Sequence, residues 1–505
     1  MPAHQWPQIE KMNTGIVGFD SIAQGGLPQN RITLVTGTAG SGKTVFAAQF
    51  LVEGITKCGE AGVFVTFEET PADIRQNMRS LGWPIEVWEA DNRWAFVDAS
   101  PEPVEELMVV GHYDLSALLA RIEFAVRKVN AKRLAMDSLN AIFTQLTDVM
   151  TVRRELYRVS FALKQTGVTA VLTAERNDEY GDIARHSIEE FLADNVVILR
   201  NVLEAEKRRR TIEILKFRGT SHKKGEFPFT ISPQEGVVVM PLFDSEMKQK
   251  SSNIRITSGN KGIDGMCDGG FFRDSIILVS GATGTGKTLM TTEFMAGGAA
   301  KGERCLLFSY EESRNQLFRN ATSWGINYEA MEKEGKLRVI CTYPEVASLE
   351  DHLINIKAEI NDFQPQRVAI DSLSALERIS TFKSYREFIL GTTSFIKARE
   401  TAGLFTCTAP ALTERISTTE AHISTITDAI ILLRYVEIYG EMRRGLTILK
   451  MRGSAHDKNI REFVIDGQGM HIGKPFRNIT GILSGNIVYV SPTEDERLSN
   501  MFQEE

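Results

Sequence analysis

Short apolar runs alternate with longer helix-like stretches along this chain. Residues 32–35, 61–67 and 168–173 are such runs, and residues 44–58 between the first two have the pattern of a helix. Strands buried on both faces lose the alternation of apolar and polar positions, so these runs predict a mostly parallel sheet. Strands that alternate with helices predict an α/β fold with helices on both faces of that sheet.

A glycine-rich segment follows the first apolar run: Gly37-Thr38-Ala39-Gly40-Ser41-Gly42-Lys43-Thr44. With a strand before it and a helix after it, the segment matches the GxxxxGK[ST] phosphate-binding loop. Backbone N–H groups of such a loop surround the β- and γ-phosphates of ATP, the lysine contacts the terminal phosphates, and the Thr44 hydroxyl group binds Mg²⁺. The alternative is a glycine-rich turn that happens to end in Lys-Thr, and the flanking strand and helix disfavour it.

The chain contains the same arrangement twice. The second segment is Gly281-Ala282-Thr283-Gly284-Thr285-Gly286-Lys287-Thr288, so Lys287 lies 244 positions after Lys43. The same offset relates Gly18-Phe19-Asp20 to Gly262-Ile263-Asp264. A fixed offset over several motifs indicates duplication of a whole domain. We expect two tandem RecA-like P-loop NTPase domains, residues 1–246 and 247–505, joined by a polar linker.

In each half an aspartate directly follows a further apolar run, at matching positions. Asp137 follows residues 134–136, and Asp371 follows residues 368–370. An apolar strand that ends in a carboxylate is the Walker B pattern, in which the carboxylate belongs to the magnesium shell. Asp137 and Asp371, together with Thr44 and Thr288, are therefore the expected magnesium ligands.

A pair of glutamates follows another strand in each half, Glu68-Glu69 and Glu311-Glu312. We expect this strand to lie beside the phosphate-loop strand, where a carboxylate can face the γ-phosphate and orient or deprotonate a nucleophile. The alternative is that each pair only begins a helix, where the helix dipole favours acidic residues. Recurrence of the pair favours the catalytic interpretation.

Each half also ends in a basic motif, Lys216-Phe217-Arg218-Gly219 and Lys450-Met451-Arg452-Gly453. Alternation places the lysine and the arginine on one face of a strand that ends at a glycine turn. Cations so far along the chain from their own phosphate loop suit contacts to a nucleotide of a neighbouring subunit, as an arginine finger does. A solvated strand face is the alternative.

Composition places the protein among ordinary soluble proteins. Of its 505 residues 42% are hydrophobic and 24% charged, and no apolar run is long enough to span a bilayer. The five cysteines lack metal-ligand spacing, and the N-terminus lacks a signal peptide, so we expect a cytoplasmic protein without a membrane. A net charge of −7 makes nucleic acid an unexpected partner.

The second half contains a hydroxyl-rich segment, residues 417–428, that the first half lacks. By itself such a segment predicts only a loop. Together with the two phosphate loops, the glutamate pairs and the basic motifs, however, the segment His422-Ile423-Ser424-Thr425-Ile426-Thr427-Asp428 resembles the KaiC family of cyanobacterial clock proteins. The resemblance extends from about residue 14 to about residue 490.

The resemblance implies a homohexamer of two rings with ATP at the subunit interfaces of both rings. The first ring would be a slow ATPase, with Glu68 and Glu69 in the hydrolytic position. The second would be an autokinase and autophosphatase acting on Ser424 and Thr425 across the interface, with Glu311 as general base. The protein would thus be a phosphorylation-state timer or switch.

The resemblance also implies partners. A KaiB-like partner is expected. Clock members of the family carry a longer C-terminal tail that engages KaiA, and this chain continues only a few residues beyond Met501, which argues against a KaiA-like partner. Ala455 also replaces a large aromatic residue of the clock proteins. A divergent paralogue fits these departures best.

Two other functional classes share the same motifs. A RecA-like DNA-remodelling ATPase would show hydrolysis stimulated by DNA, and the acidic net charge speaks against it. A switch scaffold would use the nucleotide only to drive assembly.

Overall fold

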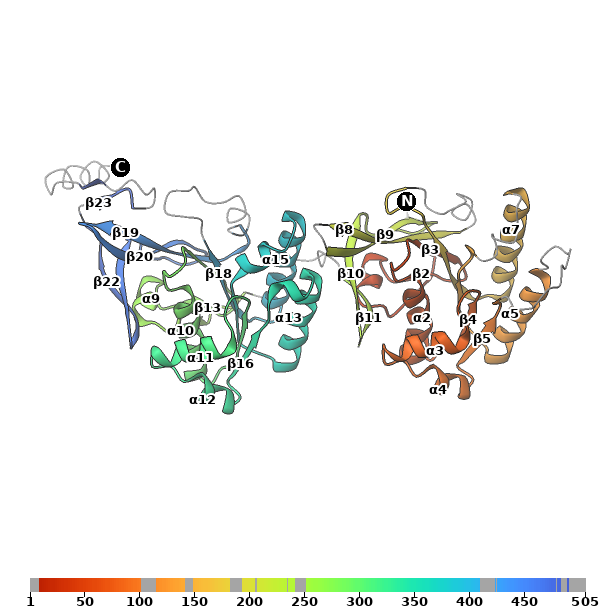
Figure 1. Ribbon diagram of the computed structural model, residues 1–505, viewed down its shortest axis with the longest axis horizontal. Helices are drawn as coiled ribbons and strands as arrows, with labels where there is room; N and C mark the ends of the chain where they lie inside the picture. Colours follow the sequence, from red (N-terminus) through yellow and green to blue (C-terminus); the bar gives the residue numbers. More distant parts are fainter. Residues whose placement is uncertain are drawn as a thin grey trace, which may run out of the picture. The chain divides into compact units, whose positions relative to one another are not determined.

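The chain divides into two compact units, Met1–Leu242 and Phe243–Glu505, each with its own sheet (Figure 1). The computed structural model describes residues 9–100, 115–140, 149–181, 193–204, 207–233, 235–240, 251–408, 423, 425–477, 479–482 and 488–489. The offset between the two halves falls from 243 at Pro101 to 234 at Leu119, so the sequence predicts an extra loop within residues 102–114 of the first half, which lies outside the described residues. None of the described helices is both long and apolar enough to cross a membrane.

The first unit is built on a nine-stranded sheet. From one edge to the other its strands are β5 (Trp94–Asp98), β4 (Gly62–Thr66), β6 (Arg133–Asp137), β7 (Thr169–Glu175), β3 (Ile32–Gly37), β8 (Asn195–Glu204), β9 (Lys207–Phe217), β10 (Glu226–Ser232) and β11 (Gly236–Val239). Neighbouring strands from β5 to β8 run parallel, and those from β8 to β11 run antiparallel. The mostly parallel sheet predicted from the apolar runs is confirmed.

The second unit repeats this topology strand for strand. Its nine-stranded sheet consists of β16 (Leu337–Cys341), β15 (Cys305–Ser309), β17 (Arg367–Asp371), β18 (Ala402–Thr408), β14 (Ile276–Gly281), β19 (Ala429–Ile438), β20 (Glu441–Met451), β21 (Arg461–Asp466) and β22 (Gly469–Pro475). Here β14 lies between β18 and β19 as β3 lies between β7 and β8. The tandem duplication inferred from the sequence therefore extends to the whole sheet.

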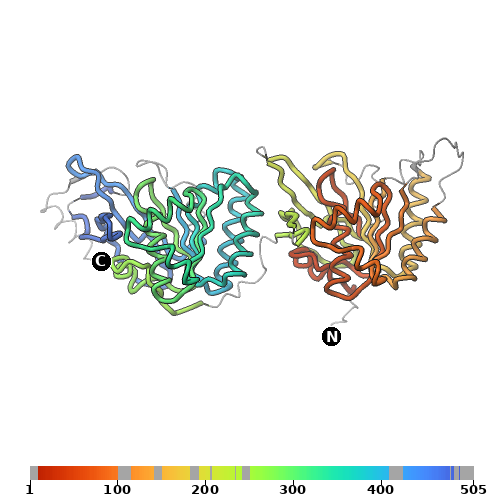
Figure 2. The backbone as a smooth tube through the Cα atoms, turned by 60° about the horizontal axis from the view of Figure 1, so that its bottom comes forward, coloured from red at the N-terminus to blue at the C-terminus, as the bar shows by residue number. Residues whose placement is uncertain are grey.

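Helices cover both faces of each sheet (Figure 2). Along β3, Val35 points into a core with helix α2 (Lys43–Glu53), whereas Leu34 points into a core with α5 (Leu115–Val129) and α7 (Val149–Thr166). Successive strand residues face opposite sides, so an apolar run supplies both cores. The remaining main helices are α3 (Pro71–Arg79), α4 (Ile85–Ala90), α10 (Lys287–Ala300), α11 (Arg314–Ser323), α12 (Tyr328–Lys333), α13 (Leu349–Phe363), α14 (Leu373–Glu377) and α15 (Phe382–Lys397).

Short elements complete the described part of the chain. They are β1 (Lys11–Met12), α1 (Phe19–Ile22), β2 (Leu27–Pro28), a π-helical turn (Gly54–Cys58), β12 (Arg255–Ile256), α9 (Lys261–Met266), β13 (Phe271–Phe272), a 3₁₀ turn (Pro344–Val346), β23 (Ile479–Thr480) and β24 (Val488–Tyr489). The helix predicted over residues 44–58 thus ends its regular α-helical part at Glu53 and continues as the π-helical turn.

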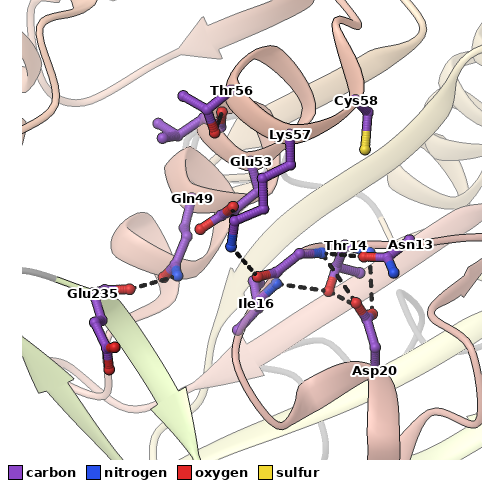
Figure 3. A network of polar contacts seen from close by, with 12 residues as sticks. Asn13, Thr14, Ile16, Asp20, Gln49, Glu53, Thr56, Lys57, Cys58 and Glu235 are labelled. Carbon is purple, nitrogen blue, oxygen red and sulfur yellow. Dashed lines mark hydrogen bonds and ion pairs between the residues drawn. The ribbon is translucent and has the colours of Figure 1, made fainter. Parts of the chain in front are cut away.

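The repeated Gly-x-Asp motif holds a loop in place. Asp20 accepts hydrogen bonds from Thr14 N and Oγ1, at 3.0 and 2.7 Å, and from Gly15 N at 3.0 Å (Figure 3). The Lys57 ammonium group donates to the Gly15 carbonyl at 3.1 Å and pairs with Glu53 at 2.7 Å. Buried backbone donors need such partners. The motif is therefore part of the scaffold.

The second unit contains the same tether. Asp264 accepts from Thr257 Oγ1 at 2.5 Å and from Ser258 N and Oγ, both at 2.6 Å. This geometry, shared by the two halves, explains why the motif recurs at the offset of the phosphate loops.

A buried arginine begins each Walker B strand. Arg133 is 1% exposed; it pairs with Glu60 at 2.7 Å and donates to the Asn13 and Phe50 carbonyls at 2.8 and 2.9 Å. Arg367 occupies the same place in the second unit and pairs with Glu303 at 2.6 Å. A buried cation is tolerated only with such partners, so each arginine fixes its strand to the N-terminal loop of its unit.

Candidate nucleotide site

Each phosphate loop joins a central strand to a buried helix. β3 ends at Gly37 and α2 begins at Lys43; Gly42 before it has a φ of 96°, and Gly286 in the second unit has a φ of 113°. A Cβ atom at Gly42 would lie 2.9 Å from Ile231 Cδ1. The positive φ values are the reason that both positions need glycine. The strand, loop and helix predicted around each motif are therefore present.

The lysine of each loop lies among carboxylates. Lys43 is buried and donates to the Thr38 carbonyl at 2.9 Å; Lys287 donates to the Gly281 and Ala282 carbonyls at 2.8 and 3.0 Å. Burial lowers the pKa of both lysines, and the carboxylates opposite them counteract it: Glu175, Asp137, Glu68 and Glu179 for Lys43, and Asp371 and Glu311 for Lys287. Both ammonium groups can therefore meet a phosphate at the carboxyl edge of their sheet.

Oxygen ligands suited to Mg²⁺ meet at the second loop. Thr288 Oγ1 donates to Asp371 Oδ2 at 2.8 Å, and Thr406 donates to the other carboxylate oxygen. Burial raises the pKa of Asp371, so a cation would stabilise its charged form. Mg²⁺ commonly uses one or two protein ligands together with phosphates and water. Thr288 and Asp371 fit such an ion.

The first unit has the same carboxylate arrangement. Asp137 ends β6 and accepts a hydrogen bond from Thr173 on the adjacent strand β7, as Asp371 does from Thr406. Sequence reasoning missed both threonines, although they recur 233 positions apart and the repeat contained that signal. Thr44, the other expected ligand, is the second residue of α2.

We predicted that the strand before each glutamate pair lies beside the phosphate-loop strand, and this prediction was wrong. Glu68-Glu69 follows β4 and Glu311-Glu312 follows β15, and in each sheet two other strands separate that strand from the phosphate-loop strand. Crossover connections set strand order, and order along the chain does not reveal it. Parallel strands nevertheless end at one edge, so both pairs still lie on the phosphate-loop side, where Glu68 and Glu311 act on the lysines.

The second glutamates of the two pairs have matching surroundings. Glu69 accepts from Asn77 Nδ2 at 2.8 Å and Glu312 from Asn320 Nδ2 at 2.9 Å. Burial, and then the nearby Walker B aspartate, raises the pKa of both glutamates. The asparagines recur 243 positions apart, a repeat that sequence reasoning also missed.

The first glutamates of the two pairs differ from each other. Glu68 Oε1 accepts from Ser138 Oγ at 2.9 Å, whereas Glu311 Oε1 lies 3.3 Å from Arg378 Nη2. Arg378 was not expected from the sequence, because its position after α14 is brought to Glu311 only by the fold. A hydroxyl donor in one unit and a cation in the other give the two carboxylates different electrostatics.

The first loop has a further carboxylate that sequence reasoning did not identify. Glu179 accepts from Thr38 Oγ1 at 2.6 Å and from Asn201 N at 3.0 Å. It therefore joins the phosphate loop to β8. The sequence held no repeat or motif that singled out this residue.

The basic motifs lie at the amino ends of the parallel strands, whereas the phosphate loops lie at the carboxyl ends. Lys216 Nζ donates to the Ala193 carbonyl at 3.0 Å, and Arg218 pairs with Asp194 at 3.6 Å, just before β8 begins. The phosphate loop instead follows Gly37, which pairs with Leu199 four residues further along β8. Four residues of strand span about 13 Å. These cations therefore lie far from the nucleotide position of their own unit.

The second unit repeats this placement and adds a candidate acceptor. Lys450 Nζ donates to the Thr427 carbonyl at 2.7 Å, and Arg452 Nη2 donates to the Thr425 carbonyl at 2.6 Å. Thr425 is exposed. Ser424, the other candidate for phosphorylation, lies outside the described residues.

Comparison with known proteins identifies the family. The family model described as "ATPase: KaiC" matches residues 12–243 and again residues 256–476. The chain is 65% identical over 496 residues to the circadian clock protein KaiC3 of Synechocystis sp., covering 98% of each protein. It is 54% identical over 494 residues to the circadian clock oscillator protein KaiC of Thermostichus vulcanus, covering 98% of this chain and 95% of that protein. It is also 54% identical to the oscillator protein KaiC of Synechococcus elongatus, over 493 residues and with the same coverage. With both repeats matched and nearly its whole length aligned, the chain belongs to the KaiC family of ATPases.

Proposed function

We propose that the protein is a hexameric ATP- and Mg²⁺-dependent switch of the cytoplasm. The first domain, residues 1–246, hydrolyses ATP slowly, and the second, residues 247–505, phosphorylates and dephosphorylates Ser424 and Thr425. Family membership supports ATP binding, and the paired geometry of Thr288 and Asp371 supports magnesium. The proposal extends to a KaiB-like partner, as the family resemblance implies.

The position of Thr425 carries this proposal. Asp428, three residues further on, has its N–H bonded to the Ile276 carbonyl at 2.9 Å, where β14 begins. The phosphate loop follows the other end of β14, at Gly281. The strand between them spans about 17 Å. A γ-phosphate held by a unit's own loop is thus out of reach, and a loop of an adjacent subunit is the natural donor.

The surroundings of the glutamates support different roles for the two domains. Glu68, next to the Ser138 hydroxyl group, is suited to position water for hydrolysis. Glu311 is exposed after the end of β15, where an incoming Ser or Thr hydroxyl group can reach it and give up its proton. Lys216 and Arg218, and likewise Lys450 and Arg452, would contact the γ-phosphate across the interface.

A mixing experiment tests transfer between subunits. One full-length variant lacks both acceptors (Ser424→Ala with Thr425→Ala), and the other lacks the general base (Glu311→Gln) and carries a mass tag. With Mg-ATP the variant without acceptors should gain no phosphate and Glu311→Gln alone should gain it only slowly, whereas the mixture should gain phosphate on the tagged chain much faster. Intact mass spectrometry distinguishes the two chains. If the mixture gains phosphate no faster than Glu311→Gln alone while tagged wild-type chains become modified, transfer occurs within one subunit and the proposal fails.

A DNA-remodelling ATPase remains the alternative function. DNA added to the wild-type protein would then stimulate ATP hydrolysis. The net charge of −7 favours the opposite outcome, hydrolysis unchanged by DNA.

A further inference from the structure

The second unit contains a cavity rich in arginine at the amino edge of its sheet. The cavity has a volume of about 240 Å³ and is lined by Arg273, Arg304, Gln366, Arg399, Glu400 and Thr401, among others. We refer to it as the arginine cavity. It is smaller than the roughly 300–1,000 Å³ of sites for drug-sized ligands, which indicates a small ligand.

Its location separates it from the nucleotide site. Arg304 immediately precedes β15, Gln366 precedes β17 and Thr401 precedes β18. These strands are neighbours in the sheet, with β14 next to β18, and all run parallel. The cavity therefore lies at the amino ends of the strands, whereas the phosphate loop follows the carboxyl end of β14.

The guanidinium groups are held by packing and leave hydrogen-bonding capacity unused. The Arg399 guanidinium lies 3.5 Å from the centre of the Phe395 ring and donates to Asn361 Oδ1 at 2.7 Å. Arg273 pairs with Glu303 at 3.2 Å. Arg304 and Arg399 are exposed, so their remaining N–H donors can meet an anion that enters the cavity.

The charge of the cavity is not fully neutralised by the protein. Within the described part of the chain no carboxylate forms an ion pair with Arg304 or Arg399. Glu400 lines the same cavity and Glu303 pairs with Arg273, so two carboxylates stand against the three arginines. Burial lowers the pKa of Arg399, the effect expected of a cation that lacks a counter-ion.

The first unit lacks these arginines. At the sequence offsets of the adjoining strands, the equivalent residues of the first unit are Gln29 for Arg273, Ala61 for Arg304 and Thr166 for Arg399. The same fold forms without them, so the scaffold does not require three cations at this edge. The first unit has instead a lysine, Lys132, opposite Gln366, so the arrangement of three arginines is particular to the second domain.

We propose that the arginine cavity binds a small phosphate-type anion, either inorganic phosphate or the phosphate end of a diphosphate compound. Planar guanidinium groups donate paired hydrogen bonds that match phosphate oxygens, and Arg is preferred over Lys where such geometry matters. The Thr401 hydroxyl and the Gln366 amide are further polar groups beside the three arginines. This site is separate from the phosphate loops and does not depend on the function proposed above.

Equilibrium dialysis with radiolabelled inorganic phosphate tests the site in the full-length protein. Both phosphate loops are first saturated with a non-hydrolysable ATP analogue and Mg²⁺, so that they cannot bind the probe. We expect saturable binding that Arg304→Ala with Arg399→Ala weakens by roughly tenfold or more, because two cations that donate hydrogen bonds to the anion are lost. Glu400→Gln should strengthen binding, because it removes a negative charge of the cavity.

Controls make the result specific. Arg386→Ala removes an exposed arginine of α15 that lies outside the cavity and should leave binding unchanged. Competition with pyrophosphate and with phosphate distinguishes the two sources of the anion. Absence of saturable binding, equal binding by the double variant, or loss of binding only in Lys43→Ala or Lys287→Ala would each overturn the proposal. A melting curve for every variant checks that it is folded.

Discussion

At the scale of residues, Glu311 and Glu312 are neighbours in the chain with different surroundings. Glu311 is exposed and lies 3.3 Å from the Arg378 guanidinium group. Glu312 is partly buried and bonded to Asn320, and burial raises its pKa. An incoming hydroxyl group can reach the exposed Glu311, whereas Asn320 already occupies Glu312, so the geometry favours Glu311 as the base and Glu312 as a residue that adjusts local charge.

This difference predicts unequal effects of two matched substitutions. Glu311→Gln keeps size and hydrogen bonding but cannot accept a proton, and loss of a general base typically costs roughly 10²–10⁴ in rate. We expect this variant to bind ATP and assemble normally, yet to phosphorylate Ser424 and Thr425 slowly. Glu312→Gln should be milder. Phosphopeptide time courses on both variants measure this, and wild-type rates for Glu311→Gln would remove Glu311 from the mechanism.

At the scale of elements, one buried glutamate joins the phosphate-loop helix to the antiparallel end of the second sheet. Glu293 on α10 accepts from Met470 N at 2.7 Å and from Asn260 Nδ2 at 3.0 Å. In the first unit Gln49 takes this position and accepts from Val237 N at 2.6 Å. Burial raises the pKa of Glu293, and its hydrogen bonds and His471 oppose that effect only in part.

The raised pKa predicts a pH-dependent stability. Between the ordinary glutamate pKa of 4.5 and the raised value, the folded protein keeps a proton that the unfolded chain has lost. The free energy of unfolding therefore falls as pH rises through this window. Glu293→Gln cannot titrate, so we expect its stability relative to wild type to increase by up to about 1.4 kcal/mol for each pH unit within the window.

Denaturant unfolding of both proteins from pH 5 to pH 7.5 measures this effect. The substitution also places a side-chain amide against the Asn260 amide, and this changes the free energy of unfolding by an amount that does not depend on pH. The slope of the free energy of unfolding against pH therefore reports only the titration. Glu329→Gln is the control, because it removes the same charge from an exposed position. Parallel stability curves for wild type and Glu293→Gln would show that Glu293 titrates normally.

At the scale of the whole molecule, the cations of both basic motifs lie at the sheet edge away from their own phosphate loop. They can neutralise a γ-phosphate only if another subunit presents it. ATP would then bridge the subunits, and a ligand that binds only the assembled form stabilises that form by mass action, by about 2.7 kcal/mol at a concentration of 100 Kd.

We therefore expect assembly to need ATP. Size-exclusion chromatography should show a hexamer in Mg-ATP and a smaller species in nucleotide-free buffer. Lys216→Ala with Arg218→Ala should shift the elution in ATP toward the smaller species. If wild type elutes at the same volume in both buffers, nucleotide does not hold the interface together.

Local patterns in the chain were enough to predict the fold class, the duplication and the phosphate loops. The apolar runs became the central parallel strands, and the glycines around Lys43 and Lys287 have the conformations that the motif demands. Lys216 and Thr425 could likewise be chosen from local motifs and the family resemblance.

How these pieces meet depends on the folded chain. Strand order is set by crossover connections and by packing between distant segments, so the chain did not reveal that two strands separate each glutamate pair from the phosphate-loop strand. The same long-range packing brings Arg378 to Glu311 and gathers Arg273, Arg304 and Arg399 around one cavity. Such contacts join residues that are far apart in sequence, and hydrophobic periodicity carries no information about them.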